Sequence, residues 1–418
     1  MSKQLIHPSQ LRSQAQPTAP EDLPFDLVKT PAYLIDCRLL EEHLKFFEAM
    51  RQSLDIKILL AQKSYSLYAT YPLIGRYLNG TTASGLHEAR LAYEEMPGSE
   101  VHCFSAAFKD DELRELYQVC DTLVFNSYSQ LKRYRELLPE LHGSRAPRIG
   151  LRLNPQISTA SHEIYDPAAP GSRLGLTRAH VDELLADSGL KDSSGDSRGD
   201  VSGFLIHALC EQGAEDFQTL LAGSLDRFDD LFREASWLNF GGGHHFTKRN
   251  YNLELFAKLC GELHDRYPQT EIYVEPGEAI SLDCGWLVCE LLDLVDNQLQ
   301  IAICDTSAVC HMPDVLEMPY RPRCFLAEAP FKLAEETGEH LYRLTGPTCL
   351  AGDRIGDYAF QRPLQIGDRL IFADMAIYTH VKTNQFNGMP LPSLYSFDDS
   401  GLHLIRHFDY QDFKNLLG

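Results

Sequence analysis

Short apolar runs alternate with helical patterns from about residue 56 to residue 275, and this alternation constrains the fold more than any other feature of the sequence. Each run has the length and residue types of a buried strand. The predicted strands cover residues 56–61, 80–83, 101–104, 122–126, 148–153, 203–208, 237–240 and 271–275, and the main helices cover 39–53, 86–95, 110–119, 127–138, 177–185, 214–231 and 253–267. A succession of about eight strand–helix units favours an α/β fold with a (β/α)8, TIM-like barrel over an open doubly wound sheet.

The pattern changes after about residue 280, where turns rather than long helices separate the strand-like segments. These predicted strands cover residues 284–294, 300–305, 340–345, 370–374, 376–382 and 402–407. A strand predicted at 31–36, ahead of the helix 39–53, is assigned to the barrel. Because 418 residues exceed one ordinary core, we predict a barrel over residues 31–280 and a mostly β domain over 281–418. Residues 1–30 are expected to form an arm that packs on the β domain, with a polar, mobile part up to about residue 24.

Composition excludes several classes of function. The 59 acidic residues outnumber the 38 basic ones, which argues against a nucleic-acid partner because no basic surface is available to neutralise phosphates. The 11 cysteines show neither a CxxC pair nor zinc-site spacing, so we expect no structural metal and reduced thiols. No apolar signal segment or membrane-length run is present, and we therefore expect a cytoplasmic protein without a membrane partner.

Polar residues and glycines follow several predicted strands at the end of the barrel where active sites lie. Lys63 follows the strand 56–61; an enclosed lysine loses its proton readily and attacks an aldehyde, although an isolated lysine is more often a surface residue. His207, in the strand 203–208, could stack on a planar ring or be an ordinary loop histidine. The run Gly241-Gly242-Gly243 could cradle a phosphate or form a flexible turn.

The later motifs carry a carboxylate, a thiol and a phenol. Glu275, in Glu-Pro-Gly with Gly277, could keep a pyridine nitrogen protonated or face solvent in a turn. Cys349 lies in a Gly-Pro-Thr-Cys turn, where an inert thiol is the simpler interpretation. Tyr378 could bind a phosphate or be a buried strand residue.

The order of these motifs resembles the fold-type III pyridoxal-phosphate decarboxylases, which share the alanine-racemase-like fold and include the ornithine, arginine and diaminopimelate decarboxylases. The resemblance runs from about residue 31 to residue 378. The versions Ala-Gln-Lys-Ser-Tyr-Ser, Ala-Ser-Gly-Leu-His-Glu, Ser-Arg-Leu-Gly and His-Ala-Leu-Cys-Glu are most similar to members that decarboxylate carboxynorspermidine or carboxyspermidine. The resemblance therefore implies norspermidine or spermidine as the product. A diaminopimelate or diamine amino-acid decarboxylase, or a non-catalytic pyridoxal-phosphate-binding homologue, is the alternative.

The resemblance also implies a role for each residue. Pyridoxal 5′-phosphate would be the cofactor, bound covalently by Lys63, stacked against His207 and paired through its ring nitrogen with Glu275. Cys349 would return a proton to the substrate carbon after CO2 leaves. The remaining phosphate contacts would be Gly241, Gly242, Gly243, Gly277 and Tyr378.

Family members are head-to-tail homodimers with shared active sites, so the resemblance implies that Cys349 and Asp353 act in the site of the partner subunit. Asp305 matches the position that binds the distal amine of the substrate, and Asp314 and Glu317 are weaker candidates for holding a polycation.

Three positions depart from the family pattern. Glu278 stands where many relatives have arginine after Glu-Pro-Gly, so either the phosphate loses a cationic contact or Glu278 turns to the substrate. Ala208 and Leu209 replace a Gly-Ser pair after the histidine, which removes one hydroxyl near the phosphate. Leu350 replaces the acidic residue that follows the cysteine in ornithine decarboxylases, which argues against ornithine as the substrate.

Overall fold

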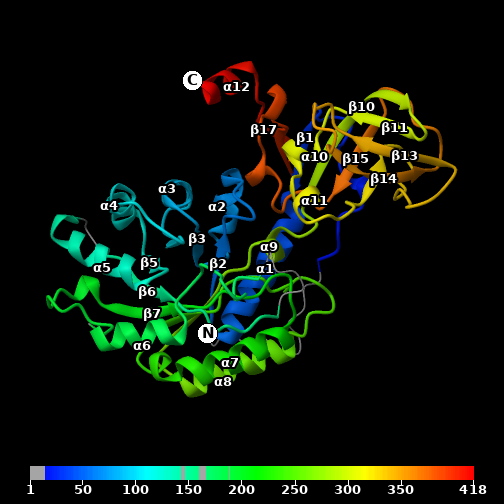
Figure 1. The fold of residues 1–418 in the computed structure, drawn as a ribbon. Coiled ribbons are helices and arrows are strands. Elements are labelled where there is room, and N and C mark those ends of the chain that lie inside the picture. The colour runs from blue at the N-terminus through cyan, green and yellow to red at the C-terminus, as the bar shows by residue number, and fades with distance from the viewer. Residues whose placement is uncertain (1–14, 143–145, 160–165, 188) are drawn as a thin grey trace. The chain divides into compact units, whose positions relative to one another are not determined.

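The computed structural model describes residues 15–418 except 143–145, 160–165 and 188, and it divides into two compact units (Figure 1). The first unit contains residues 43–280 and the second contains residues 15–42 and 281–418. The boundary lies within helix α1 (Cys37–Leu54). No helix in the described part of the chain is long and apolar enough to cross a membrane.

The first unit is a closed barrel of eight parallel strands, which confirms the predicted fold class. Its strands are β2 (Lys57–Ala61), β3 (Gly80–Ala83), β4 (Glu100–Phe104), β5 (Thr122–Phe125), β6 (Arg148–Arg152), β7 (Val201–Leu205), β8 (Trp237–Asn239) and β9 (Glu271–Val274). The helices between and after them are α2 (Tyr71–Ile74), α3 (Leu86–Glu95), α4 (Asp110–Val119), α5 (Tyr128–Leu137), α6 (Arg178–Asp187), α7 (Ala214–Phe232), α8 (Leu253–Arg266) and α9 (Glu278–Ser281). Helices α7 and α8 run side by side on the outside of the barrel (Figure 1).

A single indole fills much of the barrel interior. Trp237 is fully buried with Leu59, Val124, Leu205 and Tyr273. The neighbouring strands make room for it with glycines, since a Cβ at Gly150 or Gly203 would lie within 2.4 Å of the indole ring. The barrel is therefore a packed core, and functional side chains have to lie at its ends.

A network of charges closes the amino-terminal end of the barrel. The Lys57 ammonium lies 2.8 Å from the Glu100 carboxylate and 2.7 Å from that of Glu271, and Arg148 lies 2.6 Å from Glu271. These residues begin strands β2, β4, β6 and β9. Because their charges are paired with one another, the opposite end of the barrel is the one available for chemistry.

The second unit contains a nine-stranded sheet in the order β14-β13-β11-β10-β1-β16-β17, with β15 paired to β10 and β12. Its strands are β1 (Ala32–Asp36), β10 (Gly285–Asp296), β11 (Gln300–Cys304), β12 (Cys324–Leu326), β13 (His340–Thr345), β14 (Arg354–Phe360), β15 (Arg369–Ala373), β16 (Ser393–Asp398) and β17 (Gly401–Arg406). Its helices are α10 (Ala308–His311), α11 (Asp314–Glu317) and α12 (Tyr410–Leu417). Short 3-10 helices in the two units span Pro20–Asp22, Tyr68–Thr70, Leu138–Glu140, Ser197–Gly199, His380–Lys382 and Phe386–Gly388.

Two local predictions for this part of the chain differ from the structure. The sequence prediction places residues 31–36 in the barrel, whereas β1 pairs with β10 and β16 in the second sheet. The strand predicted at 376–382 is wrong: Asp374 and Tyr378 have positive φ angles of 61° and 49°, and such left-handed residues interrupt an extended strand.

The segment before β1 packs against the second sheet. Leu23, Phe25 and Val28 are buried in a cluster with Trp286, and the rings of Phe25 and Trp286 lie 5.4 Å apart, edge to face. The mobile part predicted for residues 2–24 lies outside the described residues up to residue 14.

Candidate active site

Lys63 lies in a tightly held turn after strand β2. The Ser64 amide donates to the Ala61 carbonyl at 3.2 Å, the Gln62 amide to the Thr82 carbonyl at 3.1 Å, and the Ala61 amide to the Pro276 carbonyl at 3.1 Å. The backbone around Lys63 is thus fixed to the neighbouring loops of the barrel.

The surroundings of Lys63 favour its neutral amine. The residue as a whole is exposed to solvent, yet protein atoms crowd its charged group. This desolvation lowers the pKa of Lys63, and the nearby positive charge of Arg152 lowers it further, whereas Glu275 opposes the shift. A lysine of lowered pKa is the nucleophile needed to bind an aldehyde.

His207 presents a neutral ring. The Gly242 amide donates to Nδ1 at 3.0 Å, so Nδ1 is an acceptor and the ring proton of the neutral form is on Nε2. Burial lowers the pKa of His207 well below its usual value, and the positive charge of Arg152 acts in the same direction. An uncharged, oriented imidazole is suited to stacking on a planar ring.

Glu275 is held in a fixed orientation at the end of β9. Its side chain is buried, with the residue 7% exposed, and one carboxylate oxygen accepts a hydrogen bond from the Asn239 amide at 2.7 Å. The Glu275 amide donates to the Gly241 carbonyl at 2.7 Å. A buried carboxylate oriented in this way can pair with a protonated ring nitrogen.

The glycines allow the loops to approach one another closely. Gly243 has a φ of 88°, and a Cβ there would lie 2.2 Å from the Leu209 carbonyl oxygen; a Cβ at Gly277 would lie 2.1 Å from the Ser64 hydroxyl. The amides of Gly241 and Gly242 donate to Asn239 and His207. Those of Gly243 and Gly277 have no hydrogen-bond partner within the described residues, and they are the ones best suited to bind a phosphate.

These residues fit pyridoxal phosphate. An amine of lowered pKa, a neutral imidazole and an oriented carboxylate lie at the ends of β2, β7 and β9, together with glycine amides after β8 and β9. Each matches one part of that cofactor: the aldehyde, the ring face, the ring nitrogen and the phosphate.

The second unit carries the predicted thiol on an anchored turn. Cys349 is exposed, and its amide donates to the Asn387 side-chain oxygen at 2.8 Å. Asp353 is only 3% exposed and accepts hydrogen bonds from the Ser307 hydroxyl at 2.8 Å and the Thr348 hydroxyl at 2.7 Å. Asp353 therefore ties the turn before and after Cys349 to helix α10.

The other predicted substrate ligands of this unit already have partners. Asp305 accepts from the Glu290 amide at 2.9 Å, and burial raises its pKa. Asp314 and Glu317 both bind the Lys382 ammonium. Tyr378 is half-buried in the irregular segment after β15.

Sequence reasoning missed three residues of the barrel site. Arg152 is buried, donates to the His207 carbonyl at 2.7 Å, and has a pKa lowered to about 10 by burial. Asn239 orients Glu275, and Glu88 caps the turn after β3 through the Ser84 amide at 2.6 Å. An arginine ending a barrel strand and an asparagine before a glycine run were the available signals.

Comparison with known proteins agrees with this arrangement. The family described as "Pyridoxal-dependent decarboxylase, C-terminal sheet domain" matches residues 32–376. A carboxyaminopropylagmatine decarboxylase from Synechocystis sp. is 39% identical over 391 residues, which cover 93% of this chain and 95% of that protein. A carboxynorspermidine/carboxyspermidine decarboxylase from Campylobacter jejuni is 36% identical over 397 residues, covering 93% of this chain and 99% of that protein. The crystal structure of carboxynorspermidine decarboxylase from Campylobacter jejuni with norspermidine superposes with a TM-score of 0.79 at 34% identity, covering 93% of this chain and all of that one.

Proposed function

This chain belongs to the pyridoxal-dependent decarboxylase family, and on that basis we propose that it decarboxylates a carboxylated polyamine, converting carboxynorspermidine to norspermidine or carboxyspermidine to spermidine. The observation that carries the proposal is the grouping of Lys63, His207 and Glu275 at one end of a single barrel. The two relatives that are 39% and 36% identical over nearly the whole chain support a substrate of this class, since both are named for carboxylated polyamines.

The residues of the barrel divide the chemistry among them. Pyridoxal phosphate, when bound, supplies an electron-accepting ring for the electron pair released with CO2. Lys63 would hold the cofactor aldehyde through its amine, His207 would stack on the ring, and Glu275 would keep the ring nitrogen protonated. The Gly243 and Gly277 amides bind the phosphate.

Cys349 is proposed to complete the reaction by giving its thiol proton to the carbon that lost CO2. It would act in the site of a second copy of the chain, and Asp353 would hold its turn in place. If so, mixing equal amounts of Lys63→Ala and Cys349→Ala subunits restores about a quarter of the activity, because half of the randomly paired dimers hold one intact site. No restored activity after subunit exchange contradicts the shared site.

A second candidate substrate is carboxyaminopropylagmatine. The relative named for it has the highest identity of those compared, 39% against 36%. This substrate has the same amino-acid end, but its tail ends in a guanidinium group instead of an ammonium group. A direct comparison of kcat/KM on the three carboxylated amines decides between them.

The test of the cofactor site is borohydride reduction of the purified protein followed by peptide mass spectrometry. A pyridoxyl group on Lys63 is expected, and Lys63→Ala should release no CO2 from any carboxylated polyamine. Lys258→Ala, on the exposed face of α8, is the matched control and should keep full activity. A pyridoxyl group on another lysine contradicts the assigned site, and a modified Lys63 without CO2 release from any of these amines contradicts the proposed reaction.

A further inference from the structure

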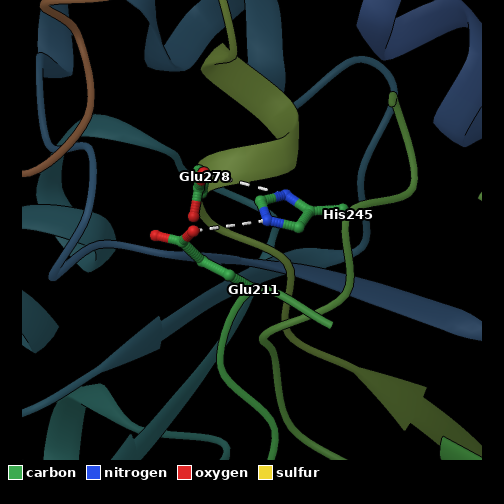
Figure 2. Close-up of side chains that lie close together, drawn as sticks. All are labelled: Glu211, His245 and Glu278. Atoms are coloured by element: carbon green, nitrogen blue, oxygen red, sulfur yellow. Dashed lines mark ion pairs between the residues drawn. The ribbon is translucent and has the colours of Figure 1, made fainter. Parts of the chain in front are cut away.

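A histidine faces two glutamates beside the proposed cofactor site. Figure 2 shows the carboxylates of Glu211 and Glu278 next to each other, with the His245 ring facing both. Nε2 lies 3.7 Å from Glu211 and Nδ1 lies 3.7 Å from Glu278, and the three ligand atoms lie within 4.8 Å of one another. We call these three residues the Glu–His–Glu cluster.

The cluster is built from the same three barrel loops as the cofactor site. Glu211 follows His207 on the loop after β7, His245 follows the glycine run after β8, and Glu278 follows Glu275 after β9. Each loop thus carries a proposed cofactor contact first and a cluster residue shortly afterwards. A group held by the cluster is therefore close to the cofactor along all three loops.

Hydrogen bonds between these loops hold the cluster in place. The Gln212 amide donates to the Gly243 carbonyl at 2.8 Å, and the His245 amide donates to the Gln212 carbonyl at 3.2 Å. The Thr247 hydroxyl donates to the Ala279 carbonyl at 2.8 Å, which ties the loop of His245 to that of Glu278. The three side chains are therefore positioned before any ligand binds.

The charges of the cluster favour an organic cation. The Lys248 ammonium lies 2.8 Å from Nε2 of His245; since an ammonium can only donate, Nε2 accepts and the neutral ring carries its proton on Nδ1, toward Glu278. Two carboxylates against the one ammonium of Lys248 leave this group of side chains with a net negative charge. The side chains of Glu211 and Glu278 are 44% and 22% exposed, so a cation in solution can reach them.

An ionised carboxylate accepts up to about four donors, so each glutamate can accept a donor from a ligand in addition to its contacts within the protein. A divalent metal is less suited to the cluster, because the Lys248 ammonium occupies the Nε2 lone pair that a metal would need.

We propose that Glu211 and Glu278 bind the cationic tail of the substrate and that His245 is a positioning residue that sets the spacing of the two carboxylates. This inference rests on the proposed function and deepens it. The ligand class is an alkylammonium or guanidinium tail. A substrate whose tail ends in a carboxylate, such as diaminopimelate, would be repelled by the same two glutamates.

The test compares one substrate with and without its tail charge. The holoenzyme is assayed on carboxyspermidine and on carboxyspermidine whose terminal amine is acetylated. The unmodified protein should prefer the charged substrate about 10- to 100-fold in kcat/KM, the range expected for hydrogen bonds to a charged group. Glu211→Gln and Glu278→Gln should each reduce this preference about tenfold or more, mainly through KM for the charged substrate.

His245 is tested by its effect on the same preference. His245→Ala should reduce it, and His245→Asn should restore part of it because the asparagine amide can replace Nδ1–H. Glu262→Gln on α8 is the matched control and should leave the preference unchanged. If every cluster variant loses kcat/KM equally for the charged and the acetylated substrate, the cluster has a structural role and the proposal is overturned.

A binding measurement separates this inference from the proposed reaction. Calorimetric titration of the holoenzyme with norspermidine should show at least about tenfold weaker binding to Glu211→Gln and Glu278→Gln, even if no carboxylated amine is turned over. Equal affinity in all variants overturns the inference while leaving the reaction intact. Stoichiometric zinc or manganese that is lost in these variants also overturns it, since the cluster would then be a metal site.

Discussion

Asp353 could contact the substrate, as its position in the motif implies, or it could anchor the Cys349 turn, and replacing it distinguishes these two roles. The hydrogen bonds of Asp353 set the loss of folding free energy to expect. Asp353 is 3% exposed and accepts short bonds from the Ser307 and Thr348 hydroxyls, with a longer one of 3.3 Å from the Val309 amide. A hydrogen bond to a charged group contributes about 1.5–3 kcal/mol, so the two short bonds set an upper limit of about 3–6 kcal/mol.

Relief of carboxylate burial offsets part of that loss in Asp353→Ala, and we expect the free energy of unfolding to fall by about 3 kcal/mol. Asp353→Asn should cost about 1 kcal/mol, because its amide can still bond both hydroxyls without the charge. The assay is denaturant unfolding followed by tryptophan fluorescence, to which Trp286 contributes from the same unit. Thr348→Val, which removes one donor with little change in shape, is the matched control and should cost about 1 kcal/mol.

Steady-state kinetics complete this test. If Asp353 anchors the turn, its variants lower kcat more than they raise KM, because the proposed proton donor is displaced while substrate binding is kept. Unchanged stability of Asp353→Asn together with a tenfold rise in KM at constant kcat would refute the reasoning and assign Asp353 to the substrate.

Three further predictions follow from buried and closely packed groups. His311 is buried, and burial lowers its pKa from 6.5 to about 4. The unfolded chain therefore binds the extra proton, and the free energy of unfolding falls by about 3 kcal/mol as the pH drops from 6.5 to 4. His311→Gln should remove that part of the acid sensitivity in urea titrations at several pH values. Arg152→Met removes a positive charge near Lys63, so the pKa of Lys63 should rise and the rate at which the apo-protein recombines with pyridoxal phosphate should shift to higher pH. Gly277→Ala places a Cβ 2.1 Å from the Ser64 hydroxyl and should weaken cofactor binding in an equilibrium titration. The control is Gly261→Ala on α8, where no atom lies near the added Cβ; it should stabilise the protein by about 0.5–1 kcal/mol.

Periodicity was sufficient to predict the barrel because each of its strands is a short buried run followed by a turn. Helices α3 and α4 have the predicted bounds, and the ends of the predicted strands lie within three residues of those of β2 to β9. The second sheet was harder to predict. Strand β14 contains Arg354, Gly356 and Asp357 in its first four residues, and β12 is only three residues long, so neither gives a clear apolar run.

A local pattern also cannot tell which sheet a strand joins. All five residues of β1 are buried, as in a central strand of either unit, and only its pairing with Val288 and Ser393 decides the matter. Those partners are more than 250 residues away in the chain. Such long-range pairing is outside the reach of periodicity, and the boundary predicted at residue 31 differs for this reason.

In the candidate site, the sequence predicts the positions of the reactive residues but not the contacts that set their chemical state. The positions of Lys63, His207 and Glu275 at strand ends follow from motif and period. Their chemical state depends on Arg152, Asn239 and Gly242, which come from other strand ends and change a pKa, orient a carboxylate or fix a tautomer. These are contacts between distant parts of the sequence. The sequence therefore predicts which groups can react, but it does not predict the contacts that set their protonation and orientation.

Glu278 shows how one loop can meet opposite electrostatic demands. The proposed phosphate site needs donors, whereas a cationic tail needs acceptors, and both lie on the segment that begins at Glu275. An arginine at position 278 would serve the phosphate and repel the tail. Here the donors are the uncharged amides of Gly243 and Gly277, which fit a phosphate without adding a second positive charge to that of Lys248 beside the Glu–His–Glu cluster. The departure at position 278 is therefore consistent with a cofactor held by backbone amides and a side-chain carboxylate that takes part in recognition of the cationic tail.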